Sequence, residues 1–207
     1  PYDAQFNSNG CLECDNYTIG ESFLVGGVRY EVADRAMLET AIADGADLTR
    51  FCTSRVGDMS NIFYSKIDFN QVISFWDVSN VTNMERMFQN AEAFNQDIGN
   101  WDVSNVTHMA RIFWNAQAFN QDIGDWDVSN VTTMARIFCS TQAFNQDIGN
   151  WDVSNVTDMS GMFDEAQAFN QDLTDWCVSN ISSVPPFFAD NSALTASNHP
   201  VWGTCPP

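Results

Sequence analysis

The chain has 207 residues, of which 27 are Asp or Glu and 8 are Lys or Arg, so its formal net charge is −19. This balance excludes binding to the nucleic-acid backbone or to anionic lipid, because both need Lys and Arg. Hydrophobic residues make up 44% of the chain, which is ordinary for a folded domain and argues against disorder. No apolar run approaches the length of a membrane-spanning helix, so no membrane insertion is expected.

The N-terminal part of the chain is predicted to form a cap. Residues 1–22 contain two cysteines and no clear periodicity, and we treat them as a separate Cys-containing segment. Residues 23–50 favour a β-hairpin that turns at Gly26, followed by a helix. Asp34 stands where it would cap the start of that helix, and Gly45 stands where it would end it.

A 25-residue repeat occupies residues 51–188. The run FNQDIGNWDVSNVTHMARIF at 94–113 returns as FNQDIGDWDVSNVTTMARIF at 119–138 and as FNQDIGNWDVSNVTDMSGMF at 144–163. Weaker copies continue in both directions without insertion. A uniform period of this length predicts that each copy is one coil of a solenoid, because one copy alone cannot bury its apolar face. Residues 189–207, where the pattern ends, are predicted to form a C-terminal cap.

Within each copy the apolar spacing changes. Ile98, Trp101 and Val103 match the leucine-rich-repeat skeleton and predict a short strand, with Asp102 facing outward. The apolar residues that follow, up to Phe119, are spaced three or four apart, which is typical of a helix. We therefore expect an α/β solenoid of leucine-rich-repeat-like, right-handed coils. Each coil would contain a short parallel strand plus a short helix or helical turn, and disulfides would fasten the caps.

Two aromatic and sulfur-containing positions of the repeat are predicted to be core. The Trp of the predicted strand would form a platform for sugars if it were exposed, but its inward phase favours burial; this column is Trp76, Trp101, Trp126, Trp151 and Trp176. The Met of the predicted helix faces the core as well. Trp114 falls outside the Trp column and is the expected exposed aromatic residue.

The cysteines indicate how the caps are held. Cys52 and Cys177 occupy the repeat position that holds Asp in the inner copies, at the first and last coils. We expect Cys177 to pair with Cys205. Cys52 is expected to pair with Cys11 or Cys14. Half of a zinc site at Cys11 and Cys14 is the alternative, but the chain has no second C-x-x-C and only two histidines. Disulfides in the caps imply an oxidising compartment.

An acidic residue recurs on each predicted strand of the inner copies and is expected to point away from the core. With the serines two positions later it forms the candidate binding face, which is Asp77, Asp102, Asp127, Asp152, Ser79, Ser104, Ser129 and Ser154. A second acidic column, in the loops before the strands, is Asp97, Asp122, Asp147 and Asp172. Like charges about 4.8 Å apart repel by roughly 1 kcal/mol in water. Such columns persist if the carboxylates accept local hydrogen bonds, which we favour, or if cations such as calcium lie between them. No known calcium-loop motif is present, so calcium stays a hypothesis and no other cofactor is expected.

Motifs of the form Asn-X-Ser/Thr fit glycosylation acceptors in a eukaryotic secreted protein. They occur at Asn16, Asn80, Asn105, Asn130, Asn155 and Asn180. The alternative is that the Asn of each repeat bonds to the backbone of a neighbouring coil, in which case it carries no glycan. We favour this second interpretation for the four internal copies from Asn80 to Asn155. Asn16 lies outside the coils and is the best glycan candidate.

The run FNQDIGNWDVSNVTDMSGMF resembles the repeat of the BspA-like surface proteins, a leucine-rich-repeat group that carries a domain of unknown function. The resemblance covers about residues 20–207. It implies a secreted or surface-exposed protein, with adhesion or protein interaction as the usual proposal, and it supplies no catalytic residue. His108 and His199 are isolated in the sequence, which also argues against an enzyme.

Three functions are compatible with these observations. The leading hypothesis is a non-enzymatic extracellular or cell-surface interaction or adhesion module that binds a protein or glycan partner through a repeat face. The alternative is a structural subunit of an extracellular filament or appendage, which would pack against identical or related subunits. A further alternative is a carbohydrate- or ice-binding array, in which regular spacing matters more than any single residue.

Overall fold

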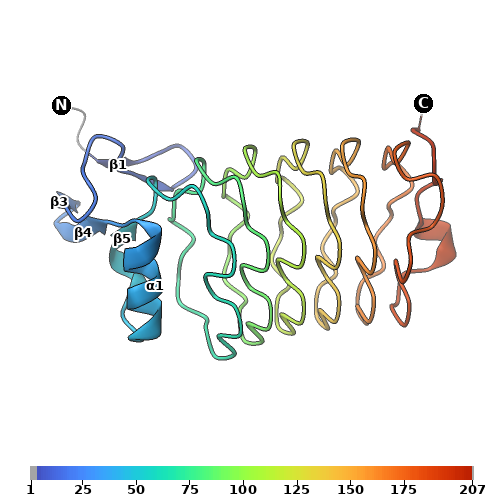
Figure 1. Ribbon diagram of the computed structural model, residues 1–207, viewed down its shortest axis with the longest axis horizontal. Helices are drawn as coiled ribbons and strands as arrows, with labels where there is room; N and C mark the ends of the chain where they lie inside the picture. Colours follow the sequence, from blue (N-terminus) through green and yellow to red (C-terminus); the bar gives the residue numbers. More distant parts are fainter. Residues whose placement is uncertain (1–3, 207) are drawn as a thin grey trace.

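The computed structural model describes residues 4–206 (Figure 1). Its helices and strands lie near the two ends of the molecule. In chain order they are β1 (Gln5–Phe6), β2 (Leu12–Glu13), β3 (Ser22–Val25), β4 (Val28–Val32), α1 (Arg35–Ala43), η1 (Leu48–Arg50), β5 (Phe51–Cys52) and η2 (Ala196–Asn198). Strands β1 and β2 form an antiparallel pair, and β3, β4 and β5 form a second sheet in which β5 joins β4 in parallel.

The predicted hairpin and helix of the N-terminal cap are confirmed. Strands β3 and β4 are joined by a turn at Gly26, whose φ of 58° suits glycine. The side chain of Asp34 accepts a hydrogen bond of 2.9 Å from the backbone N–H of Met37, as an N-cap residue does. Helix α1 buries Leu38 and Ala41 against the first residues of the repeat. The cap therefore covers the apolar end that the first copy would otherwise expose.

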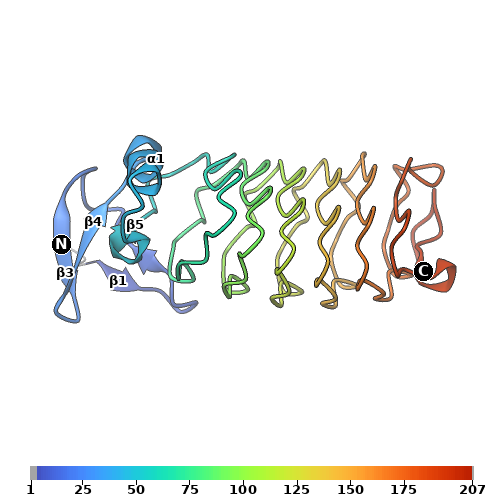
Figure 2. The same cartoon turned by 90° about the horizontal axis from the view of Figure 1, so that it is seen from below.

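The predicted α/β solenoid is wrong. Residues 53–195, which we call the repeat region and all of which the structure describes, contain no helix and no strand. The β pairing found there is a line of isolated single-residue bridges through Asp58, Asn83, His108, Thr133 and Asp158. The repeat region is instead a succession of irregular turns and bends, and Figures 1 and 2 show these turns one behind another along the long axis. Leucine-rich-repeat-like coils with a strand and a helix in each copy do not form.

Backbone hydrogen bonds explain why the predicted helix is absent. The N–H of Ile112 donates to the carbonyl of Met109 in its own turn (3.2 Å), whereas the N–H of Phe113 donates to Ile137 in the next copy (3.1 Å). A helix needs each N–H to reach the carbonyl four positions earlier, so alternate donors are lost to the neighbouring copy. The φ of 61° at Arg111 interrupts the helical path as well. The apolar spacing that suggested a helix arises from consecutive tight turns.

The predicted strand is absent for a related reason. Turns close at Trp101, whose N–H donates to Ile98 (3.2 Å), and at Val106, whose N–H donates to Val103 (2.9 Å). Two turns so close together leave no extended segment long enough to pair. The alternation that predicted inward-facing Trp101 and Val103 nevertheless describes their burial correctly, because both side chains are buried.

The core consists of columns of aromatic and aliphatic side chains, one from each copy. The rings of Phe88 and Phe113 are 5.7 Å apart, and those of Phe113 and Phe138 are 5.8 Å apart, all nearly parallel. The Trp column is buried as predicted, and the indole N–H of Trp126 donates to the carbonyl of Ile98 (3.1 Å). The predicted Met column, which is Met84, Met109, Met134 and Met159, is fully buried as well. The indole ring is therefore buried with its N–H group hydrogen-bonded.

The stack of hydrogen-bonded turns ends near the C-terminus. Pro186 accepts a bond from the preceding copy but has no N–H to donate onward. The N–H of Phe188 turns back to the carbonyl of Pro185 (3.2 Å). The tail lies over this end, where the N–H of Val178 donates to Thr204 (2.8 Å). The chain thus ends its own stacking of turns.

Candidate functional site

Each Asp of the predicted binding face forms a turn with the serine two residues later. The backbone N–H of Ser104 donates to Oδ1 of Asp102 (3.1 Å), and the Ser104 hydroxyl donates to the same oxygen (2.6 Å). The same backbone bond, 3.0 Å long each time, joins Ser79 to Asp77, Ser129 to Asp127 and Ser154 to Asp152. These bonds confirm the predicted local hydrogen bonding, which holds each carboxylate in a defined direction.

The loop column is held in the same way. Its carboxylates accept backbone N–H bonds of 2.9–3.1 Å from the residue two positions later; the pairs are Asp97 with Gly99, Asp122 with Gly124, Asp147 with Gly149 and Asp172 with Thr174. Hydrogen bonds from Thr174 lower the pKa of Asp172, and bonds from Ser129 lower the pKa of Asp127. Both effects favour the ionised carboxylate.

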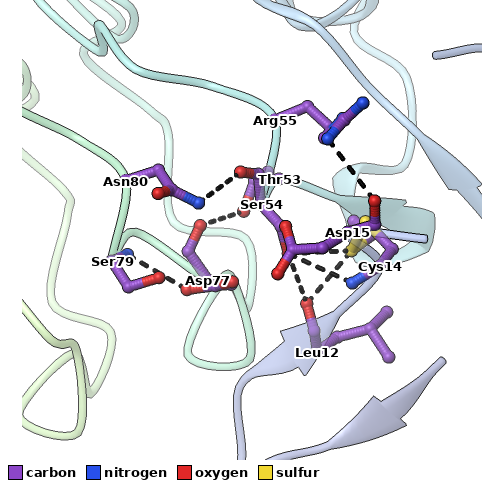
Figure 3. The surroundings of a disulfide bond; sticks show 10 residues. Leu12, Cys14, Asp15, Thr53, Ser54, Arg55, Asp77, Ser79 and Asn80 are labelled. Carbon is purple, nitrogen blue, oxygen red and sulfur yellow. Dashed lines mark hydrogen bonds between the residues drawn. A yellow bond between two sulfur atoms is a disulfide. The ribbon is translucent and has the colours of Figure 1, made fainter. Parts of the chain in front are cut away.

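Asp77 differs from the other members of the predicted face because it is buried, with 4% of its surface exposed. Figure 3 shows it beside the Cys14–Cys52 disulfide, where the hydroxyl of Thr53 donates to the Asp77 carbonyl (2.8 Å). Cys11 and Asp15 of the N-terminal segment lie within electrostatic range of Asp77, so this segment lies beside the buried first member of the column. Asp102, Asp127 and Asp152 remain exposed.

We call the exposed carboxylates of the two columns, together with the exposed Asp125 and Asp175, the acidic edge. It consists of Asp97, Asp102, Asp122, Asp125, Asp127, Asp147, Asp152, Asp172 and Asp175, all of them exposed. Every charged residue in the ranges 97–105, 122–130, 147–155 and 172–180 is one of these aspartates. The acidic edge is therefore a surface of a single sign of charge, built from the same short segment of each copy.

A pocket of about 330 Å³ lies within the acidic edge and is lined by Asp102, Asp125 and Asp127, among others. Asn9 of the N-terminal segment lines it too, and Asn100 fixes that contact by donating to the Asn9 carbonyl (2.8 Å). Among residues 4–206, however, no group of three or more His, Cys, Asp or Glu side chains is arranged to hold a metal ion.

The Asn of each copy bonds to the preceding copy. The side-chain amide of Asn105 donates to the carbonyl of Ser79 (2.8 Å), and that of Asn130 donates to Ser104 (2.7 Å). Equivalent bonds of 2.7–2.9 Å are made by Asn80, Asn155 and Asn180. The predicted backbone bonding is confirmed, and it uses the nitrogen that a glycan would occupy. Asn16 is exposed, and its glycosylation stays a prediction.

The structure contains the Cys177–Cys205 disulfide that was predicted, and it selects Cys14 as the partner of Cys52. The zinc alternative is excluded because Cys14 is oxidised. Cys11 and Cys139 are buried free thiols. Burial is the main cause that raises the pKa of Cys11 to about 11, with Asp77 and other nearby carboxylates adding to it.

Two features of the repeat region escaped prediction. One is a second asparagine ladder, in which Oδ1 of Asn95 accepts bonds from the Asn120 N–H (2.9 Å) and from the Gln121 amide (2.8 Å). The recurring Asn-Gln pair after each Phe was the available signal. The other concerns Trp114, predicted to be exposed, which is half-buried with Arg111 and Arg136 at 5.9 and 5.2 Å from its ring centre.

Those two arginines belong to a column with Arg86, and we call these three residues the arginine column. Their φ angles are 57°, 61° and 56°, in the left-handed region that suits Gly or Asn. Holding another residue there costs about 1–2 kcal/mol. The signal in the sequence was plain, because the three arginines are spaced by one full period.

Comparison with known proteins identifies a family but not a function. Among residues 4–206, no helix is both long and apolar enough to cross a membrane. No curated protein and no solved structure matches the chain. The family model described as "Mycoplasma protein of unknown function, DUF285" matches residues 34–138 and 120–204, which together exceed half of the chain. This match concerns the DUF285 domain and does not extend to the BspA-like group. The chain is therefore a member of the DUF285 family.

Proposed function

We propose that this protein is a non-enzymatic interaction module, extracellular or on a cell surface, that binds a protein or glycan partner through the acidic edge. The observation that carries the proposal is the acidic edge itself, which presents nine exposed carboxylates and no basic side chain. Because all of these carboxylates except Asp125 and Asp175 are held by their own turns, binding costs little ordering of side chains. A surface of one sign of charge also speeds the encounter with a partner of opposite sign.

The location outside the cell rests on two arguments. The Cys14–Cys52 and Cys177–Cys205 disulfides support an oxidising compartment. The resemblance of the WDVSNVT and FNQDI segments to the BspA-like surface proteins supports the same location. A non-enzymatic role is supported by the separation of the histidines, since His108 bonds to Thr107 in the repeat region and His199 packs on Phe188 near the C-terminus.

The test removes charge from the acidic edge without removing its turns. In the triple variant Asp102→Asn, Asp127→Asn, Asp152→Asn, each Oδ1 remains an acceptor for the backbone N–H. The chain itself supports this exchange at another turn of the repeat: Asn83 accepts the N–H of Glu85 (3.0 Å) as Asp58 and Asp158 accept the N–H groups of Ser60 and Ser160 in their copies. The triple variant should therefore fold as the wild type does, which circular dichroism and thermal unfolding would check.

Immobilised protein is then exposed to the secreted material of the source organism, and bound proteins and glycans are quantified by mass spectrometry. We expect the triple variant to lose its partner at least tenfold. The matched control carries the same change of charge on exposed aspartates elsewhere; it is Asp44→Asn, Asp68→Asn, Asp190→Asn. Equal capture by the triple variant and the wild type would exclude the acidic edge as the binding surface.

A structural role is the second candidate, and the arginine column favours it. A subunit that packs against copies of itself needs a surface complementary to its acidic edge. Arg86, Arg111 and Arg136 are the basic side chains that recur at one position of the repeat. In that case native material should sediment as assemblies larger than one chain.

A further inference from the structure

The basic side chains in the second part of the chain form a single column. Beyond Lys66 the Lys and Arg residues are Arg86, Arg111 and Arg136, and no others occur. They stand at one position of the repeat, one full period apart each time. The neighbouring Phe rings of the same copies are 5.7 and 5.8 Å apart, so the arginine column advances by a similar step. The more acidic part of the chain therefore contains one short, regular row of positive charge.

The backbone at this position does not favour arginine. All three residues have positive φ, and the equivalent residue of the next copy is Gly161, whose φ is 61°. A copy with Gly at this position therefore folds with the same backbone conformation. Arginine is thus present in three successive copies although the local conformation suits glycine, which indicates that the guanidinium groups have a role.

Contacts within the chain neutralise this column incompletely. Glu85 lies 3.3 Å from Arg86 and 3.6 Å from Arg111, so one carboxylate serves two guanidinium groups. Nε of Arg111 is buried and has no hydrogen-bond partner. Within residues 4–206, Arg136 makes no ion pair; its guanidinium lies over Trp114 and within electrostatic range of Asp164. The side chains of Arg86 and Arg111 remain 41% and 31% exposed, so a second molecule can reach them.

We propose that the arginine column binds the acidic edge of a second copy of this chain, so that copies associate side by side. This inference rests on the proposed function of the acidic edge and names a partner for it. The argument is the common period, because Asp102, Asp127 and Asp152 recur at the same sequence interval as the arginines. A second copy laid alongside brings one carboxylate to one guanidinium at each of three steps, a pairing that Arg forms well. A polyanion of another spacing would lose register after the first contact.

Salt concentration separates this contact from the repulsion between two acidic molecules. At physiological ionic strength charges interact over about 8 Å, so the distant carboxylates of the two copies hardly repel each other while contacting pairs still attract. At 1 M salt the screening length is about 3 Å, and the contact itself weakens. Association should therefore be measurable at 0.15 M NaCl and should fall at least tenfold at 1 M.

Sedimentation equilibrium of the whole chain tests the proposal. The variant Arg86→Gln, Arg111→Gln, Arg136→Gln keeps an unbranched side chain at each position and should lose association at least tenfold. A matched control removes three positive charges elsewhere, at Arg29, Arg50 and Arg55, by the same change to Gln, and should associate as the wild type does. A wild type that stays monomeric up to millimolar concentration would overturn the proposal, as would equal association of the variant and the wild type.

Mixing two variants gives the decisive result. The Asp102→Asn, Asp127→Asn, Asp152→Asn protein keeps the arginine column, and the arginine variant keeps the acidic edge. Each alone should be monomeric, and an equimolar mixture should form heterodimers. A mixture that stays monomeric refutes this contact, whereas capture of an outside partner by the acidic edge is measured separately and can hold without it. Heparin, used as an anionic glycan probe, covers the remaining case: heparin binding that needs the arginines, with a monomeric wild type, would replace the second copy by a free polyanion.

Discussion

Replacing Gly124 with Ala is expected to push two neighbouring copies apart. A Cβ at Gly124 would lie 2.6 Å from the carbonyl oxygen of Asp147 in the next copy, a distance that real Cβ atoms essentially never show. The oxygen belongs to the main chain, so only a backbone shift relieves the contact. Overpacking of this kind costs about 1–3 kcal/mol. The substitution also restricts the unfolded chain, which returns about 0.4–1 kcal/mol. We expect the free energy of unfolding to fall by about 1–2 kcal/mol.

The matched control is Gly57→Ala. Its Cβ would lie 3.6 Å from the carbonyl of Asn80, an ordinary contact, and neither Gly57 nor Gly124 has a positive φ. Gly57→Ala should therefore leave stability unchanged or raise it by about 0.5 kcal/mol. Urea unfolding followed by Trp fluorescence measures both, with the midpoint compared at equal slope. The same midpoint for the two variants would refute the close approach of neighbouring copies at Gly124.

Three further outcomes are expected. Asn130→Ala should lower the free energy of unfolding by about 1 kcal/mol in chemical denaturation, because the carbonyl of Ser104 loses its 2.7 Å bond; an unchanged midpoint would contradict the ladder. Cys14→Ser should cost up to about 4 kcal/mol, since the bond to Cys52 closes a loop with a sequence separation of 38, and peptide mapping without reductant would verify the pairing. Burial raises the pKa of Cys11 from 9.0 to about 11, so the folded state favours the neutral thiol. The free energy of unfolding should fall as pH rises from about 9 to about 11, and this fall should shrink in Cys11→Ser.

The sequence predicted burial well and backbone conformation poorly. Trp101, Val103 and Phe113 are buried as their spacing indicated, because the inward or outward direction of a side chain follows from the period alone. The period does not show where backbone N–H groups find acceptors. Phe113 donates to Ile137 in the next copy rather than within a helix, and this choice between copies becomes visible only in three dimensions.

The candidate site was predicted in part. The turn made by Asp102 with Ser104 follows from a local preference of Asp, so sequence reasoning reached it. The burial of Asp77 could not be reached in the same way, because it depends on a segment much earlier in the chain that folds back beside the first copy. Residues 1–22 have no periodic pattern from which that position could be predicted. A local sequence pattern does not show which distant segment will cover a residue.

Because Pro186 has no N–H to donate, the stacked turns end there. The length of the repeat region is therefore set by the number of copies in the sequence and not by molecules joining end to end. Because the succession of turns ends there and under the C-terminal tail, a second molecule cannot extend it end to end. Internal copies meet nearly identical neighbours on both sides, so whole repeat units can be added or removed between the caps without breaking register. Each added repeat unit with Asp at the position of Asp122 and Arg at the position of Arg136 would lengthen the acidic edge and the arginine column by the same step. The length of the molecule and the strength of its binding would then change together with each added unit.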